Sequence, residues 1–205
     1  MNTFLQNIWN DIHKSNRVEP AVSGQVFNDL MARYAEKHRH YHTVAHLVQL
    51  FETVLAHREA VQNFEAMAMA IFFHDAIYDT YRKDNEAQSA LLAAKMMPVL
   101  GHSPSTTQWV CEAIQTTQNH QAPVNANADL HLLLDADLAI LGSPPDRYRN
   151  YDAAIRREYS WVPYFLYRQK RRQALLQLAA RQPLYYTPFM QELYEEQARK
   201  NLNSV

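Results

Sequence analysis

The feature that most constrains the fold is an apolar run, Ala66–Phe73, inside the segment from Asn63 to Ala76. Apolar side chains occupy nearly every position of this segment, so a helix formed here is hydrophobic on all sides. Such a helix is stable only when other elements cover it completely. The sequence therefore predicts a central buried helix at 63–76.

The rest of the chain also favours helices. Phe4, Leu5, Ile8, Trp9 and Ile12 repeat with the helical period, and no segment alternates apolar and polar residues as a strand does. Predicted helices cover residues 3–13, 20–34, 43–57, 63–76, 85–100, 105–118, 130–141, 146–159, 164–180 and 187–202. Asp84 is the expected N-cap and Gly101 the expected terminator of the helix between them. The prediction is an all-α fold.

Composition narrows the functional classes. The 205 residues suit one domain spanning 1–205, and the net charge of −1 gives no field that attracts nucleic-acid polymers or anionic membranes. Three glycines argue against a glycine-rich phosphate loop, and the single Cys111 excludes an internal disulfide or a cysteine-based zinc site. No signal peptide or membrane-length apolar run is evident, so we expect a cytoplasmic protein. The sequence leaves the oligomeric state open.

Residues that can bind a metal lie on both sides of the apolar run. His74 and Asp75 come directly after Phe73, and burying such a pair is costly unless a metal or another partner offsets the cost. His42 and His46 are four positions apart, a spacing that places both on one helix face, so they are either two ligands or one ligand beside one acid. Asp137 lies farther along among leucines, where a carboxylate needs a partner. Without a metal, His74 and Asp75 would only be a polar pair ending a helix.

The order His, His-Asp, Asp resembles the HD-domain superfamily of metal-dependent phosphohydrolases. Ala136-Asp137-Leu138 is similar to the last motif of that superfamily, and Tyr41-His42-x-x-x-His46 resembles a signature of cyclic-nucleotide phosphodiesterases. The resemblance implies a single-domain HD-type helical bundle holding one divalent ion, which could be Mn, Fe, Co, Ni, Mg or Zn. The implied ligands are His46, His74, Asp75 and Asp137, with Asp135 in reserve, and His42 is the implied general acid.

A closer resemblance is to small bacterial proteins described as predicted metal-dependent HD phosphohydrolases. It covers about residues 30–200 and places the metal-site core at about 38–142, with C-terminal helices at about 146–203. The strings that carry it are Arg39-His40-Tyr41-His42-Thr43, Phe73-His74-Asp75-Ala76-Ile77-Tyr78-Asp79, Asp84-Asn85-Glu86, Asp135-Ala136-Asp137-Leu138-Ala139-Ile140-Leu141-Gly142 and Ile155-Arg156-Arg157-Glu158-Tyr159.

This ligand set implies hydrolysis of a phosphomonoester, a nucleotide or a related small phosphate compound by a metal-activated water. Arg39 and Lys83 are the expected phosphate-binding residues. Glu86 or Asp79 is expected to orient the water or to support the ligands, although Glu86 could equally belong to a helix start. Asp135 could instead be a carboxylate on a helix face.

Two functions other than phosphate hydrolysis fit the same residues. A two-iron oxygenase would need His102 and His120 as additional ligands, and a non-catalytic sensor would bind a metal and a nucleotide without turnover. His13, His57 and His131 are expected at the surface. The basic run Arg156, Arg157, Arg168, Arg171 and Arg172 is expected on a solvated helix face, with a phosphate-facing arginine as the alternative.

Overall fold

The computed structural model describes residues 2–14 and 18–203, and within these ranges every regular element is a helix. This confirms the predicted all-α fold. In the same ranges, no helix combines the length and apolarity needed to cross a bilayer. The chain divides into two compact units, Met1–Leu133 and Leu134–Val205, and the boundary falls within one helix. That the whole chain forms one HD-type domain stays a prediction.

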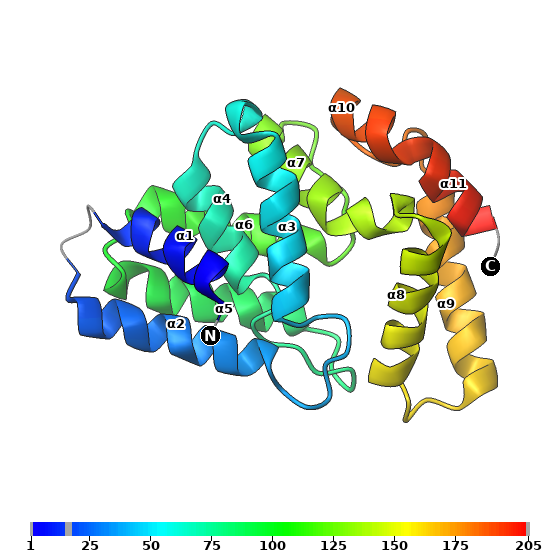
Figure 1. Cartoon of the computed structure of the whole chain (residues 1–205), viewed down its shortest axis with the longest axis horizontal. Helices are drawn as coiled ribbons and strands as arrows, with labels where there is room; N and C mark the ends of the chain where they lie inside the picture. Colours follow the sequence, from blue (N-terminus) through cyan, green and yellow to red (C-terminus); the bar gives the residue numbers. More distant parts are fainter. Residues whose placement is uncertain (1, 15–17, 204–205) are drawn as a thin grey trace. The chain divides into compact units, whose positions relative to one another are not determined.

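Figure 1 shows the elements in chain order. The first unit contains α1 (Thr3–His13), α2 (Pro20–Tyr34), α3 (Val44–Ala56), the short η1 (Arg58–Ala60), α4 (Phe64–Phe73), α5 (Asn85–Val99), α6 (Pro104–Thr117) and most of α7 (Ala128–Leu138). The second unit continues with η2 (Ala139–Gly142), α8 (Pro145–Glu158), α9 (Tyr164–Ala179), α10 (Pro188–Met190), the π-helical η3 (Gln191–Glu195) and α11 (Glu196–Asn203). Most bounds lie close to the predicted ones, but α4 ends before Ala76.

The helix α4 is buried on all sides, as its composition predicts. Every side chain from Ala66 to Phe73 has 2% or less of its surface exposed. The ring of Phe72 packs against three rings from other helices, those of Trp9, Phe27 and Phe51, at centroid distances of 5.1, 6.2 and 4.8 Å. These rings come from α1, α2 and α3, and α5 and α6 also contact α4. Burial of each such aromatic side chain contributes about 1.5–3 kcal/mol.

The two predicted end signals of α5 behave differently. Gly101 follows the helix with φ of 77°, the left-handed conformation that glycine adopts without strain, so its role as terminator is confirmed. Asp84 occupies the N-cap position but makes no capping bond with its side chain. Its carboxylate instead pairs with Arg82 at 2.7 Å and accepts a hydrogen bond from Gln88 at 3.0 Å.

Buried carboxylates hold the backbone of distant segments in both units. In the first unit, the two carboxylate oxygens of Asp129 accept hydrogen bonds from the backbone N–H groups of Gln62 and Asn63, each at 2.8 Å. In the second unit, Asp135 accepts from the backbone N–H groups of Tyr186 and Thr187, each at 2.7 Å. Because each carboxylate is buried, these bonds compensate for the loss of hydration.

The second unit also contains a glycine that close packing requires. A Cβ atom at Gly142 would lie 2.6 Å from both the Cβ and the carbonyl oxygen of Tyr194, which no relaxed structure allows. Beside it, the side-chain amide of Asn201 donates to the carbonyl groups of Leu141 and Ser143, each at 2.8 Å. The turn η2 is therefore held tightly against the elements η3 and α11.

The expectation that His13 lies at the surface is wrong. Its side chain is buried, and its Nδ1 donates to the carbonyl of Trp9 at 2.8 Å. Its Nε2 lies 3.2 Å from the Nε2 of His102, whose Nδ1 faces the Glu65 carboxylate at 2.5 Å. Because its Nδ1 proton is directed at Trp9, neutral His13 offers the lone pair of its Nε2 to His102. Helical periodicity placed His13 on the edge of α1 but could not show these partners.

The burial of His13 predicts a pH-dependent stability. Burial, with the charge of His102, lowers the pKa of His13 below its ordinary value of 6.5. The unfolded chain therefore binds a proton more readily than the native chain, and the free energy of unfolding falls as the pH drops through the interval just below 6.5. Urea unfolding at pH 8 and at pH 5.5 should show a smaller change for His13→Gln than for a His57→Gln control. Equal changes in the two variants would contradict this interpretation.

Candidate metal centre

The candidate centre lies where α4 ends. His74 is the C-cap of α4 and keeps helical backbone angles, and its N–H donates to the carbonyl of Ala70 at 2.9 Å. Beyond it the chain leaves the helix, and the tyrosine hydroxyl of Tyr34 accepts a hydrogen bond from the N–H of Asp75 at 3.2 Å. The first polar side chains after the apolar run therefore stand at the edge of the core, on backbone that is fixed from both sides.

Three potential ligand atoms meet at this point. The Nε2 atoms of His46 and His74 are 3.2 Å apart, and Oδ2 of Asp75 lies 3.0 Å from His74 Nε2 and 3.8 Å from His46 Nε2. The three ligand atoms all lie within 4.8 Å of one another. Both histidines are buried, and 14% of the Asp75 side chain is accessible. The structure thus brings together three of the four predicted metal ligands.

The protonation of His74 fits a metal ligand. Its Nδ1 lies 2.9 Å from the carbonyl of Ile71, so this nitrogen is the donor and the lone pair of Nε2 is directed at the other two ligand atoms. Atoms bound to one ion at about 2.1 Å lie about 3.0–3.4 Å apart. Two of the three separations, 3.0 and 3.2 Å, fall in this range, and the third, 3.8 Å between His46 and Asp75, is longer. Two imidazole nitrogens and a carboxylate oxygen suit a divalent ion such as Mn²⁺, Fe²⁺ or Zn²⁺.

His42 lies beside this group but outside the helix that carries His46. The helix α3 begins at Val44, with the hydroxyl of Thr43 accepting a hydrogen bond from the N–H of Ala45, so the two histidines do not share a helix face as expected. The Nε2 of His42 is still only 4.0 Å from Oδ2 of Asp75, and its ring packs on that of Tyr78 at a centroid distance of 4.3 Å. One-fifth of the His42 side chain is accessible, unlike that of His46.

Arg39 is buried beneath the site and holds its backbone. Its Nη1 donates to the carbonyl groups of Asp75 at 2.7 Å and His42 at 3.3 Å, and its Nη2 donates to the carbonyl of Ala76 at 3.2 Å. Its Nε donates to the Glu36 carboxylate at 3.0 Å, and none of its side chain is exposed. These contacts favour a positioning role for Arg39, and phosphate binding by Arg39 stays a prediction.

The carboxyl group of Glu86 responds to the charges of the site. Glu86 lies in the first turn of α5 and is half-buried. Burial raises the pKa of its carboxyl group, and the negative charge of Asp75 raises it further, whereas His120 and His74 act in the opposite direction. A carboxyl group with a raised pKa beside a metal-binding group is suited to holding a proton. The raised pKa supports the predicted place of Glu86 beside the metal ligands, and its role in orienting the water stays a prediction.

Two other predicted residues occupy the loop before α5. Oδ1 of Asp79 accepts a hydrogen bond from the N–H of Tyr81 at 2.9 Å, a turn typical of aspartate. The backbone of Asp79 is held by the side chain of Asn85, which bonds its N–H and its carbonyl at 3.1 and 2.9 Å. The side chain of Lys83 is exposed. The catalytic role of Asp79 and the phosphate-binding role of Lys83 stay predictions.

The two acidic residues of α7 differ in their surroundings. Both oxygens of Asp135 are occupied by the backbone and hydroxyl groups of residues 186–187, so Asp135 acts as a structural acceptor in the second unit. Asp137 lies on the same helix and is half-buried. The assignment of Asp137 as the fourth ligand stays a prediction.

The histidines required for a two-metal site are not both at the centre. His102 lies between His13 and Glu65, and both of its ring nitrogens are engaged there. It is not part of the group formed by His46, His74 and Asp75. His120 has a positive φ of 53° and influences the charge of Glu86. The engagement of His102 argues against the two-iron alternative.

Several positioning residues of the site were not predicted. Besides accepting from Asp75, the Tyr34 hydroxyl donates to the carbonyl of Phe72 at 3.2 Å. The hydroxyl of Ser89 accepts from the N–H of Ile77 at 3.0 Å and donates to its carbonyl at 3.3 Å. In the sequence, Tyr34 is one of twelve tyrosines and Ser89 one small residue of a helix, so nothing distinguishes them.

No protein-family model, curated protein or solved structure matches the chain. The resemblance to the HD superfamily therefore depends on the sequence motifs and on the buried histidine and aspartate group within an all-helical fold.

The contacts of Arg39 predict that it controls metal affinity without binding the metal. In Arg39→Lys, one ammonium group cannot bridge three carbonyl groups, so the turn that carries Asp75 loses its support. We expect Mn²⁺ to bind about 10–100-fold more weakly, as measured by calorimetry. An Arg82→Lys control, at an exposed arginine paired with Asp84, should bind Mn²⁺ like the native chain. Unchanged affinity in Arg39→Lys would refute the positioning role.

Proposed function

We propose that the chain is a metal-dependent phosphohydrolase of the HD type, acting on a phosphomonoester, a nucleotide or a related small phosphate compound. The observation that carries the proposal is the convergence of His46, His74 and Asp75, with the Nε2 lone pair of His74 directed at the other two ligand atoms. Two imidazole nitrogens and one carboxylate oxygen, all within 4.8 Å of one another, form a donor set that suits a divalent ion.

In this proposal, His46, His74 and Asp75 hold one divalent ion, with Asp137 as the fourth ligand inferred from the sequence. The ion supplies the Lewis acidity that lowers the pKa of a water molecule and polarises a phosphoryl group. An ion with four protein ligands retains room for the water and for a substrate oxygen. Arg39, Tyr34 and Ser89 keep the ligand-bearing turn in place.

His42 is the proposed proton donor to the leaving oxygen. It is more accessible than the ligands, it lies 4.0 Å from Asp75, and the ring of Tyr78 fixes its orientation. Glu86, with its raised pKa, is the proposed group that orients the water. Proton transfer of this kind contributes about 10²–10⁴-fold to the rate.

Removing a ligand should abolish both metal retention and hydrolysis. The test measures bound metal by mass spectrometry and phosphate release from nucleotides and sugar phosphates with Mn²⁺, in the native chain and in Asp75→Asn and His74→Gln. We expect both signals to fall to background, because each variant removes one of the three ligands that converge in the structure and with it most of the affinity for the ion. Asp84→Asn and His57→Gln remove a carboxylate and an imidazole elsewhere and should keep both signals.

The same measurements separate the alternatives. Tight metal binding with no phosphate release across the panel would replace the proposal with the sensor function. Two iron atoms per chain together with consumption of O₂ would replace it with the oxygenase function. Phosphate release that persists in Asp75→Asn would refute the assignment of the centre.

The role of His42 predicts a different pattern. His42→Gln removes the proposed acid but none of the ligands, so the chain should bind Mn²⁺ with native affinity. We expect kcat to fall about 10²–10⁴-fold, with a smaller loss for substrates whose leaving group is a good one, such as a nitrophenolate. Equal losses for good and poor leaving groups would contradict acid catalysis by His42.

A further inference from the structure

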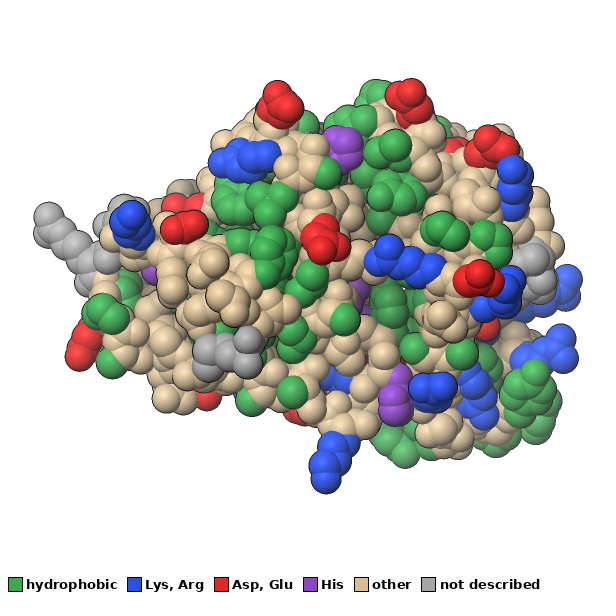
Figure 2. Space-filling view, in the orientation of Figure 1, with side chains coloured by type: hydrophobic (Ala, Val, Ile, Leu, Met, Phe, Trp, Pro, Cys, Tyr) green, Lys and Arg blue, Asp and Glu red, His purple; other side chains and the backbone are tan. Residues whose placement is uncertain are grey.

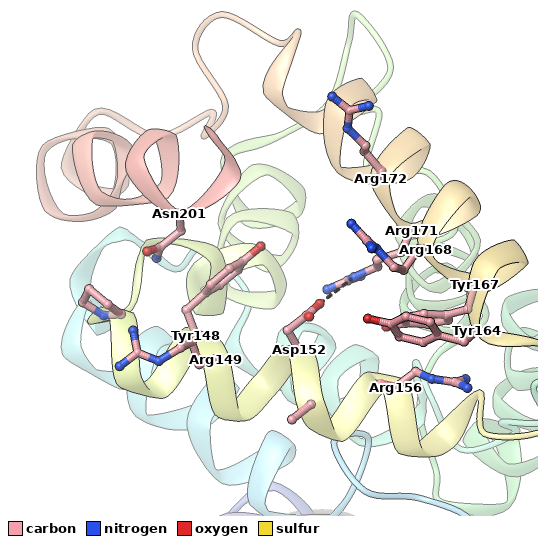
Figure 3. A pocket seen from close by; sticks show the side chains of 12 residues that line it. Tyr148, Arg149, Asp152, Arg156, Tyr164, Tyr167, Arg168, Arg171, Arg172 and Asn201 are labelled. Atoms are coloured by element: carbon pink, nitrogen blue, oxygen red, sulfur yellow. Dashed lines mark hydrogen bonds and ion pairs between the residues drawn. The ribbon is translucent and has the colours of Figure 1, made fainter. Parts of the chain in front are cut away.

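The second unit contains a pocket rich in arginine between α8 and α9. Its volume is about 710 Å³, within the range of small-molecule sites. Figure 3 shows the side chains of Arg149 and Arg156 on α8 and of Arg168, Arg171 and Arg172 on α9 lining this space. Figure 2 shows blue side chains gathered on the side where α8 and α9 lie. All of the lining residues belong to the second unit.

Positive charge in the pocket exceeds negative charge. Asp152 is the one carboxylate among the lining residues, and it pairs with Arg171 at 3.0 Å. Arg149 pairs with Asp146, which lies outside the pocket lining, so three of the five arginines have no ion pair among the described residues. Arg168 and Arg172 make no ion pair within the described residues. Such a concentration of one sign attracts a ligand of the opposite sign.

Two buried hydroxyl groups in the pocket lack a hydrogen-bond partner. Tyr148 and Tyr167 are 5% and 8% exposed, and neither hydroxyl has a partner among the described residues. Burial raises the pKa of each tyrosine to about 12, so both remain neutral donors at physiological pH. An unsatisfied buried hydroxyl is unfavourable, because it loses its hydrogen bonds to water without gaining others. A ligand that accepts hydrogen bonds would remove this cost.

Other contacts hold the pocket in shape. Arg156 donates to the carbonyl groups of Tyr159 and Val162, and its guanidinium lies 4.8 Å from the centroid of the Tyr167 ring. The guanidinium of Arg171 lies 5.1 Å from the centroid of the Tyr151 ring, and its Nη2 has no hydrogen-bond partner within the described residues. The pocket is therefore preorganised, which reduces the entropic cost of binding.

We propose that this pocket binds a small anion with two or more phosphate-type charges, contacted by the free arginines Arg168 and Arg172 and by the hydroxyl groups of Tyr148 and Tyr167. Arginine offers paired donors that match phosphate oxygens, and the tyrosines supply neutral donors deeper in the pocket. Arg157, Arg168 and Arg172 are exposed, as the expectation of a solvated basic face requires. The proposal adopts the alternative, a phosphate-facing arginine, for Arg168 and Arg172. This inference does not depend on the metal centre, because the pocket lies within the second unit.

The test titrates the full chain, treated with EDTA, with inorganic pyrophosphate, ADP and adenosine by calorimetry. Removing metal keeps the result independent of the proposed hydrolase site. We expect pyrophosphate and ADP to bind and adenosine not to bind. Similar affinities for the first two would identify the phosphates as the recognised group, and at least tenfold tighter binding of ADP would identify a nucleotide ligand. No binding of either would overturn the proposal.

Matched arginine variants show whether the pocket is the site. Arg168→Gln combined with Arg172→Gln should weaken binding of pyrophosphate at least tenfold. Arg147→Gln combined with Arg157→Gln removes the same charge from exposed positions of α8 outside the pocket and should change the affinity less than twofold. Equal losses in the two pairs would mean that overall charge attracts the anion, which would overturn the proposal.

Tyrosine variants provide a second test, in which binding of pyrophosphate should weaken while the stability of the chain does not fall. Tyr148→Phe and Tyr167→Phe each remove an unsatisfied buried hydroxyl, so without ligand both variants should unfold at a temperature no lower than the native chain. Both should nevertheless bind pyrophosphate about five- to tenfold more weakly. Native affinity in both variants would overturn the assignment of these hydroxyl groups as donors to the anion.

Discussion

The arrangement of the first unit depends on the burial of α4. Because this helix has no polar face, α3, α5 and α6 pack against it, and Phe72 contacts rings from α1, α2 and α3. The apolar run ends at Phe73, so His74 and Asp75 are the first polar side chains at the boundary of the core. The position of the candidate metal centre thus follows from the hydrophobic effect, which places the end of α4 where other elements can supply further ligands.

Several charged side chains of this protein bind backbone groups and thereby stabilise the fold. Arginine has only donors, so Arg39 binds the carbonyl groups of Asp75 and Ala76 in the turn that follows α4. Carboxylates have only acceptors, so Asp129 and Asp135 take N–H groups of loops that belong to no helix. The same residue types bind metals and phosphates in other settings. Their partners in space, not their type, therefore decide which role each one has.

This distinction explains which features could be predicted from the sequence. Helical periodicity and the end signal at Gly101 locate the helices well, because they reflect local preferences and the face that each helix buries. The pair His74-Asp75 was predictable because its ligands are adjacent and follow an apolar run. The contacts of Arg39 and His13 were not predictable, because a period shows which face is buried but not which distant carbonyl or imidazole lies against it. The prediction that His42 shares a helix face with His46 was also wrong, because Thr43 caps α3 and the helix begins after His42.

The two buried aspartates also imply a difference in timing during synthesis. The partners of Asp129, Gln62 and Asn63, have already left the ribosome when Asp129 emerges, so this carboxylate can be satisfied at once. The partners of Asp135 follow it by 51 and 52 positions. Until they are made, burial of Asp135 would leave a charge without hydrogen bonds. The carboxylate of Asp129 can therefore be bonded as soon as it is made, whereas that of Asp135 must wait for residues 186 and 187.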